Sequence, residues 1–421
     1  MDTSHVELLS YVNEILDEVK ARGDKALIEF TKLFDKVELK PDQIKVDPET
    51  ILKAYENVND IEIEAIHYLK KRIEEVEKER LKTMTYNFDR KESRVFSSFF
   101  PIQSIGCYVP GGRAVYPSTL LMTVVPAKIA GVPKIVIASP PTYKKDINPL
   151  ILVTADICDV QEIYRIGGAQ AIAAMAYGTE SVSSVLKIVG PGRGYVTTAK
   201  MLVANNVAID VPAGPSEVLV IADDSANPRY IALDLISQAE HGEESIAVLI
   251  TTSNDLVSKV IGELKKMLKV IPRNDYVSKA LLNMGRIIVC QDIDEAIDVT
   301  NSFAPEHLEI HCRDPETIAK RIFSAGIILL GQYTPVSITD YCVGTNHVLP
   351  TNGYGHVYSG LSVFDFVRRV DVVRCSKEGL HEMMNHLKTL SHSEGLPNHY
   401  LAVEGRMRDE QDMFKLDRGS N

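Results

Sequence analysis

The chain has 421 residues, which exceeds one ordinary hydrophobic core and suits two or three domains. Hydrophobic residues make up 45% of the sequence and charged residues 24%, a composition typical of a soluble globular protein and not of a disordered one. The net charge of −11 argues against a nucleic-acid backbone as a partner.

The sequence also lacks the usual signs of export or membrane insertion. Residues 1–7 have no cationic region followed by an apolar core, and no apolar run reaches the roughly 20 residues of a membrane span. The six cysteines are scattered and form no CxxC pair, which disfavours a thiolate zinc cluster and a disulfide framework. We therefore expect a cytoplasmic protein with no membrane partner.

The first hundred residues have the pattern of helices. Apolar side chains recur at helical spacing over residues 6–19 and 26–34, with Asp24 as the expected N-cap of the second helix. A long charged helix is expected over residues 60–91. Glu74 and Lys78 lie four residues apart there and predict an ion pair on its solvated side.

From residue 104 the sequence pattern changes, because short apolar runs begin to alternate with helical segments. Strands are expected at residues 104–109, 134–138, 162–166, 186–189, 218–221, 247–251, 286–289 and 326–330. Such alternation indicates parallel sheets built from βαβ units. The predicted fold class is α/β, with two Rossmann-like parallel-sheet domains, a helical N-terminal region and a small C-terminal segment. One sheet is expected within residues 108–218, and the other within 219–360 together with the early helices.

A glutamine and a histidine lie three residues apart near the end of one helical stretch. Gln238 and His241 fall in or just after residues 230–240, so helical geometry puts both on one face. The pair can ligate a metal ion. Alternatively, His241 ends the helix beside Gly242, with its imidazole near the negative end of the helix dipole.

A second pair, Glu306 and His307, follows Pro305 and precedes an apolar run at residues 308–311. Adjacent residues on a regular strand point to opposite faces, so the two can share a site only in a turn that the proline initiates. A neighbouring carboxylate makes an imidazole more basic, which suits a general base. The alternative is two surface residues where a strand begins.

Two further histidines and an aspartate are weaker candidates. Asp340 and His347 bracket a loop with Gly344, where the backbone can approach a ligand closely. A plain turn closed by the Asp340 carboxylate is the alternative. The sequence around His399 alone gives little indication of a functional role.

Three glycine-containing turns, at residues 110–112, 167–168 and 190–192, follow expected strands and precede helices. The N–H groups at the start of such helices can bind the phosphate of a cofactor. None of the turns has the G-x-G-x-x-G pattern of dinucleotide-binding domains. From spacing alone, ordinary β–α turns are therefore the better explanation.

Together these segments resemble the histidinol dehydrogenase family. The most specific are Ser-Gln-Ala-Glu-His-Gly (237–242), Ala-Pro-Glu-His-Leu (304–308) and Gly-Thr-Asn-His-Val-Leu-Pro-Thr (344–351). The same order and similar spacing extend to residues 106–114, 167–174, 176–182, 212–219 and 394–399. The resemblance implies a zinc-dependent enzyme that oxidises L-histidinol through L-histidinal to L-histidine with two molecules of NAD, the last steps of histidine biosynthesis.

The resemblance also implies roles for individual residues. Glu306 would activate water and His307 would act as the base in both hydride steps. The implied zinc ligands, one ion per subunit, are Gln238, His241, Asp340 and His399. The implied substrate contacts are Ser216, His307, His347 and Glu394 together with the four zinc ligands. The implied cofactor contacts are Tyr108, Gln170 and, with a departure from the family, Arg193.

The departure at Arg193 concerns a position that is usually asparagine in the family, so contact with the pyrophosphate of NAD or tolerance of NADP is left open. By resemblance, residues 1–107 and 219–360 form the substrate and metal domain, and residues 108–218 the nucleotide-binding domain. Residues 361–421 would be a dimerisation segment that contributes Glu394 and His399 to the active site of the partner in a homodimer.

Three alternatives stay open at this point. A related zinc and NAD enzyme could act on another polar alcohol, such as a sulfonated diol. A thiol-dependent aldehyde dehydrogenase could use Cys107 or Cys342 as nucleophile, although both suit small buried hydrophobes. A zinc hydrolase without redox activity would use the same histidine and glutamate to activate water.

Overall fold

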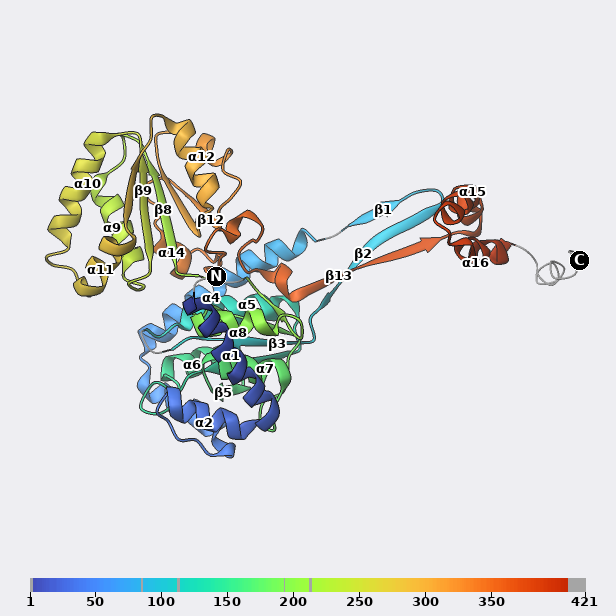
Figure 1. Cartoon of the computed structure of the whole chain (residues 1–421), viewed down its shortest axis with the longest axis horizontal. Helices are drawn as coiled ribbons and strands as arrows, with labels where there is room; N and C mark the ends of the chain where they lie inside the picture. Colours follow the sequence, from blue (N-terminus) through green and yellow to red (C-terminus); the bar gives the residue numbers. More distant parts are fainter. Residues whose placement is uncertain (1–2, 85, 112–113, 193, 212–213, 408–421) are drawn as a thin grey trace, which may run out of the picture. The chain divides into compact units, whose positions relative to one another are not determined.

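The structure is a computed structural model that describes residues 3–84, 86–111, 114–192, 194–211 and 214–407. The chain divides into two compact units (Figure 1). The first comprises residues 1–81 and 101–366, and the second comprises residues 82–100 and 367–421.

Two parallel five-stranded sheets and their covering helices form the first unit within the described residues. The helices are α1 (Thr3–Arg22), α2 (Asp24–Phe34), α3 (Pro48–Ala54), α4 (Asp60–Lys82), α5 (Pro117–Ala130), α6 (Pro149–Ile157), α7 (Gly168–Tyr177), α8 (Gly194–Val203), α9 (Pro228–Ala239), α10 (Asn254–Met267), α11 (Asn274–Met284), α12 (Ile293–Phe303), α13 (Pro315–Ala319) and α14 (Val336–Tyr341). The predicted α/β class with two Rossmann-like sheets is confirmed.

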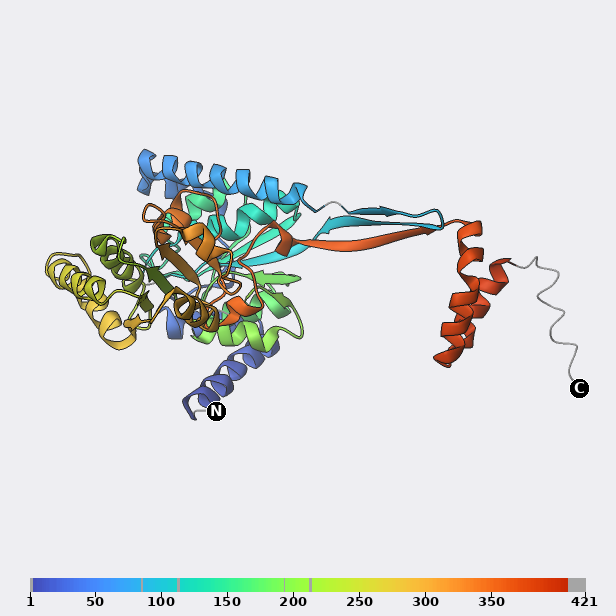
Figure 2. The ribbon, with the colours of Figure 1, turned by 90° about the horizontal axis from the view of Figure 1, so that it is seen from above.

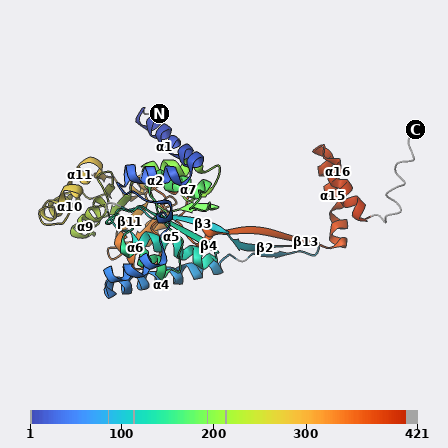
Figure 3. The same ribbon diagram turned by 90° about the horizontal axis from the view of Figure 1, so that it is seen from below.

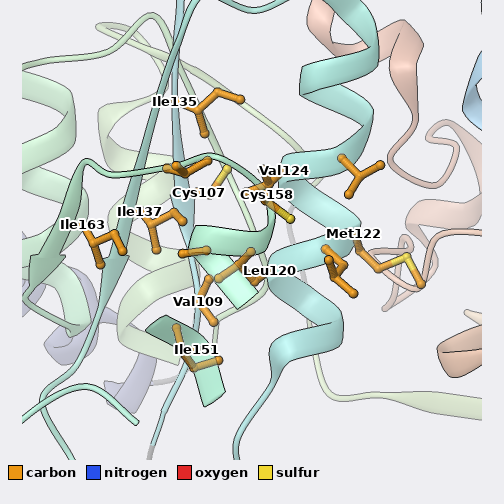
Figure 4. Packing of buried hydrophobic residues seen from close by; sticks show 14 of the residues in the cluster. Cys107, Val109, Leu120, Met122, Val124, Ile135, Ile137, Ile151, Cys158 and Ile163 are labelled. Carbon is orange, nitrogen blue, oxygen red and sulfur yellow. The ribbon is translucent and has the colours of Figure 1, made fainter. Parts of the chain in front are cut away.

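The first sheet has the strand order β5-β4-β3-β6-β7, and all its pairs are parallel. Its strands are β3 (Ser104–Tyr108), β4 (Lys134–Ser139), β5 (Ile163–Arg165), β6 (Lys187–Val189) and β7 (Ala208–Ile209). One face packs on α5 and α6, with Cys107 and Ile137 of the sheet against Leu120 and Ile151 (Figure 4). Helices α7 and α8 cover the other face. Figure 3 shows α7 on the side of the sheet opposite to α5 and α6. Strands buried on both faces read as continuous apolar runs, which is why the sequence reveals them.

The N-terminal helices pack against the first sheet. Helices α1 and α2 contact α7 and α8 through an apolar face that includes Val12, Leu16 and Leu27. The sequence predicts these helices beside residues 219–360, but they pack on the helices that cover the first sheet. Asp24 was expected to cap α2, and this is wrong. The N-cap is Gly23, while the Asp24 carboxylate accepts a hydrogen bond of 2.6 Å from the Thr179 hydroxyl.

The second sheet has the order β10-β9-β8-β11-β12, again with parallel pairs. Its strands are β8 (Glu217–Ala222), β9 (Ile246–Thr251), β10 (Arg286–Val289), β11 (His307–His311) and β12 (Ile327–Leu330). Helices α9 and α10 cover one face, and α12 and α13 cover the other (Figure 1). His307 pairs with Val218 in register, so the amino ends of the neighbouring strands β8 and β11 lie side by side.

The second unit contains a three-stranded sheet and a helical pair (Figure 2). Its elements are β1 (Asn87–Asp89), β2 (Ser93–Pro101), β13 (Val367–Cys375), α15 (Lys377–Ser393) and α16 (Pro397–Met407). The helix expected over residues 60–91 ends at Lys82, and this part of the prediction is wrong. Beyond it, β1 and β2 pair antiparallel, and their charged side chains are exposed strand residues and not the outer face of a helix. The predicted ion pair between Glu74 and Lys78 is confirmed at 3.1 Å.

No helix among the described residues is long and apolar enough to cross a membrane. All six cysteines are free thiols.

Candidate active site

The amino ends of β8 and β11 are joined by hydrogen bonds between Ser216, Glu217, Glu306 and His307. The Glu306 carboxylate accepts bonds at one oxygen, Oε2, from the Ser216 hydroxyl at 2.7 Å and from the Glu217 N–H at 2.8 Å. In return, the Glu306 N–H donates to the Glu217 carboxylate at 3.3 Å. The backbone can turn here because Ala304 has a positive φ of 54°. Glu306 thus lies just before the strand and His307 is its first residue.

The orientation of the His307 ring is set by a backbone carbonyl. Its Nδ1 lies 3.0 Å from the Glu217 carbonyl oxygen, which can only accept, so Nδ1 carries the hydrogen. The other nitrogen, Nε2, is buried and has no hydrogen-bond partner among the described residues. Burial alone would lower the pKa of His307, but the Glu306 carboxylate 3.5 Å away, together with Asp340, raises this pKa to about 9.

Glu217 is a buried acid that the sequence motifs do not predict as a site residue. Its carboxylate accepts hydrogen bonds from the Asn352 N–H at 2.9 Å and from the Glu306 N–H. Burial, reinforced by the charge of Glu306, raises the pKa of Glu217 to about 7. A glutamate opening an otherwise apolar strand directly after Ser216 is the sequence signal that points to it.

Asp340 and His347 lie together across the loop that separates them. The His347 Nδ1 is 3.3 Å from the Asp340 carboxylate, and its Nε2 is 3.1 Å from the hydroxyl of Thr119 on α5. Burial would raise the pKa of Asp340, but the hydrogen bond and charge of His347 lower it. Gly344 has a φ of 83° and packs against the backbone of α4, which explains the glycine in this loop. Thr119 was also not predicted as a site residue, because a single threonine in an apolar helix belongs to no recognisable motif.

Gln238 and His241 reach the same region from the end of α9. The helix ends at Ala239, so Gln238 is helical and His241 lies in the turn that follows. Gln238 is buried, and its Nε2 has no hydrogen-bond partner among the described residues. Burial lowers the pKa of His241, and the nearby charges of Asp340 and Glu306 oppose this effect. The charges of these side chains thus shift one another's pKa, as they do between His241, His307 and Asp340.

A pocket of about 370 Å³ opens beside His241. It is lined by apolar residues of α4 and α5, by Tyr116 and Tyr341, and by Glu62, Glu240 and Arg273. A cavity of this size and mixed lining can hold a small molecule.

The expected cofactor contacts lie at the turn between β5 and α7. Gln170 is buried, and neither atom of its side-chain amide has a hydrogen-bond partner among the described residues. The Tyr108 hydroxyl accepts a bond of 3.2 Å from the N–H of Gly168 at the start of α7. Gly190, at the next turn, has a φ of 118° and packs against the backbone of Tyr108. Arg193 lies outside the described residues.

Glu394 and His399 belong to the second unit, where Glu394 caps α15 and His399 lies in the first turn of α16. Both side chains are exposed. The other described candidates belong to the first unit.

Cys107, one of the two cysteines considered as a nucleophile, is not an activated thiol. Cys107 is fully buried among apolar side chains (Figure 4), and burial raises the pKa of its thiol to about 12. A thiol with such a pKa is protonated at neutral pH and is a poor nucleophile. Cys342 is exposed at the end of α14.

Comparison with known proteins decides the family. The family model described as histidinol dehydrogenase matches residues 1–407. The histidinol dehydrogenase of Methanococcus maripaludis is 44% identical over 401 residues, covering 95% of this chain and 93% of the relative. That of Clostridium acetobutylicum is 43% identical over 405 residues, covering 96% and 93%. The crystal structure of histidinol dehydrogenase from Elizabethkingia anophelis superposes with a TM-score of 0.91 at 40% identity, covering 95% of this chain and 92% of that chain.

The chain belongs to the histidinol dehydrogenase family. Histidinol dehydrogenases are oxidoreductases that oxidise histidinol to histidine in histidine biosynthesis. The comparisons do not support an enzyme for a sulfonated diol or a zinc hydrolase. As a histidinol dehydrogenase, the chain acts on a small molecule, which agrees with the pocket beside His241.

Proposed function

We propose that this chain oxidises L-histidinol in two NAD-dependent steps, through L-histidinal, at a zinc site made of Gln238, His241, Asp340 and His399 of the partner subunit. The observation that carries the proposal is the grouping of acid, base and unpartnered polar atoms around the amino ends of β8 and β11. The His307 Nε2 is buried there without a hydrogen-bond partner among the described residues. The buried side-chain nitrogen of Gln238 on α9 has none either and, as a donor, would meet an acceptor on a bound substrate. Buried polar atoms without partners are rare in folded proteins and indicate a group that the chain does not supply.

The donor set fits a zinc ion. An amide, an imidazole and a carboxylate give nitrogen and oxygen donors without thiolates, and such sites leave coordination positions open for substrate. The Asp340 carboxylate is oriented by His347, which is the usual way of fixing a metal-binding side chain. When bound, zinc would hold and polarise the substrate and so orient its alcohol carbon for reaction.

The cofactor site also fits. The buried amide of Gln170 lies in the first turn of α7, a helix that follows a parallel strand and whose N-terminus suits a phosphate group. Tyr108 braces this turn through its hydroxyl. NAD bound here would accept the hydride in each of the two oxidations.

His307 serves as the base in both oxidations. Its Nδ1–H is committed to the Glu217 carbonyl, so in the neutral ring the lone pair is on Nε2, the unpartnered atom. Nε2 takes the hydroxyl proton of the substrate alcohol, and later that of the hydrated aldehyde. The Glu306 carboxylate 3.5 Å away stabilises the imidazolium that forms.

Glu306 activates the water that converts histidinal to its hydrate. One oxygen of its carboxylate, Oε2, accepts hydrogen bonds from the Ser216 hydroxyl and the Glu217 N–H. The other oxygen accepts none from the described residues and can take a proton from water. Positioned bases of this kind contribute roughly 10²–10⁴-fold to a rate. Ser216 therefore positions Glu306. Because its hydroxyl lies beside this carboxylate, it can also contact the substrate.

We propose in addition a homodimer in which the second unit of each chain completes the site of its partner. The exposure of Glu394 and His399 supports this. The exposed apolar side chains of Leu390 (63%) on α15, Leu401 (54%) on α16 and Leu396 (46%) between the two helices support it as well. Surface leucines that are grouped in this way often mark a protein contact.

The test is an assay of zinc-loaded protein with histidinol and NAD. The expected result is two NADH and one histidine per histidinol, with no turnover of a sulfonated diol. Absence of NADH formation by folded, zinc-loaded protein would overturn the proposal. For the shared site, inactive His399→Asn and Glu306→Gln chains are mixed after dissociation. Mixed dimers should regain up to one working site, whereas a mixture without any recovered activity would contradict sharing across subunits.

A further inference from the structure

A second polar cluster is buried under helix α9, away from the residues of the proposed reaction. It consists of Asp234 on α9 and of Glu309 and His311 on β11. Side chains alternate along a strand, so Glu309 and His311 lie on the same face of the sheet as His307. That face is covered by α9 (Figure 1). The cluster is thus set among apolar core residues such as Val220.

The cluster contains buried polar atoms that the protein leaves unpartnered. Glu309 has no exposed surface, and only 3% of His311 is exposed. One carboxylate oxygen of Glu309 accepts a 2.9 Å bond from the Val336 N–H. Its other oxygen and both ring nitrogens of His311 have no hydrogen-bond partner among the described residues. Burying such atoms without partners destabilises a fold unless a bound group supplies the missing contacts.

The spacing of these atoms is that of metal ligands. The His311 Nε2 is 3.5 Å from the Glu309 Oε2 and 3.8 Å from the Asp234 Oδ2. These distances are too long for good hydrogen bonds. Ligands about 2.1 Å from a tetrahedral zinc ion, by contrast, stand roughly 3.4 Å from one another. Within the described residues, this is the one group of three or more histidine, cysteine and acidic side chains that meets this kind of spacing.

We propose that Asp234, Glu309 and His311 form a second zinc site, separate from the one in the active site. One imidazole and two carboxylates, without sulfur, suit a borderline divalent ion such as Zn²⁺, with water as the fourth ligand. The ion neutralises two carboxylates that are otherwise forced together in an apolar layer. This site does not depend on the proposed reaction, because none of its ligands belongs to the active-site set.

A competing explanation for the cluster is a shared proton. Burial and the adjacent Glu309 raise the pKa of Asp234 to about 9, so a protonated Asp234 can donate to Glu309. This arrangement accounts for the two acids. It leaves both nitrogens of His311 without partners, whereas a metal ion engages His311 and both carboxylates at once.

The site would act as a structural link. Asp234 lies four residues, or about one helical turn, before Gln238 on α9. Glu309 lies two residues after His307 on β11. An ion bound by both elements therefore holds the helix that carries a proposed zinc ligand against the strand that carries the proposed base.

The experiment counts zinc in the full-length protein expressed in zinc-supplemented medium, by elemental analysis. The proposal predicts about two equivalents per chain in the unaltered protein. His311→Gln should retain about one, and His241→Asn, which alters only the active-site set, should also retain about one. Circular dichroism confirms that each variant is folded.

A direct measurement covers the case in which His311→Gln fails to fold. Crystals of the unaltered protein are measured on both sides of the zinc absorption edge. An anomalous peak between Asp234, Glu309 and His311 supports the proposal. Absence of a peak there, with zinc in solution, overturns it. If folded His311→Gln still binds two equivalents of zinc, the second zinc site is also overturned. Loss of zinc in His241→Asn alone would concern the active-site zinc and not the second site.

Discussion

Replacing Glu306 by glutamine separates the two oxidations. Glutamine has the shape of glutamate, and its amide oxygen can still accept from the Ser216 hydroxyl and the Glu217 N–H, which lie 2.7 and 2.8 Å from the Glu306 carboxylate. What disappears is the negative charge and the ability to take a proton from water. The hydride steps do not need that proton transfer, but hydration of histidinal does.

Two magnitudes follow from the geometry. The carboxylate lies 3.5 Å from the His307 Nδ1, and at an effective dielectric constant of about 20 this pair is worth roughly 5 kcal/mol. Its loss lowers the pKa of His307 from about 9 toward or below its ordinary value. A base with a lower pKa is deprotonated at lower pH, so the rising limb of the rate against pH shifts to lower pH. Loss of the water-activating base should slow histidinal oxidation by roughly 10²–10⁴-fold.

The assay measures NADH formation from histidinol and from histidinal separately, over about pH 6–10, a range wide enough to contain the titration of the base. The expected result is a burst of one NADH per site from histidinol, followed by slow turnover, and a rising limb at lower pH than in the unaltered enzyme. Ser216→Ala is the matched control, because it removes a hydrogen-bond donor from the carboxylate and leaves the charge. Equal slowing of both oxidations by Glu306→Gln would refute the assigned role.

Three other substitutions test the framework of the site. Thr119→Val removes the hydroxyl that contacts His347 and should raise KM for histidinol by roughly threefold to tenfold, the loss of one hydrogen bond, with kcat less affected; an unchanged KM in steady-state kinetics would speak against this contact. Lys200 on α8 forms a buried ion pair with Asp210. Lys200→Met leaves the Asp210 carboxylate without this cation and should lower the free energy of unfolding by roughly 3–5 kcal/mol in urea titrations. A loss below about 1 kcal/mol would mean that the carboxylate is solvated or protonated at little cost. Gly344→Ala forces a side chain onto a backbone with φ of 83° against α4 and should cost about 1–3 kcal/mol, seen as a lower Tm; an unchanged Tm would show that the loop relaxes freely.

Much of the fold can be predicted from the sequence because parallel strands covered on both faces are continuous apolar runs between turns. The strand expected at residues 286–289 is β10 with the same bounds, and that expected at 134–138 is β4 extended by one residue. The sheet of the second unit was not predicted. Its strands are largely exposed and carry charged residues, so they lack the alternation that marks a half-buried strand.

The candidate site could be predicted only in its separate parts. Glu306 and His307 stand out as a pair, but their bonds to Ser216 and Glu217 join residues about ninety positions apart, and no local pattern encodes such a contact. The packing of α1 was misjudged for a similar reason. An amphipathic face shows that a helix is partly buried without showing which sheet it covers.

The reciprocal bonds between Glu217 and Glu306 have a consequence for redesign. Each carboxylate accepts a hydrogen bond from the main-chain N–H of the other residue, so a substitution that removes the acceptor oxygen at either position loosens both strand ends at once. Anyone reshaping this enzyme for a different alcohol should treat the two glutamates as one exchangeable unit. Libraries that vary them jointly will sample working geometries that single-site libraries miss.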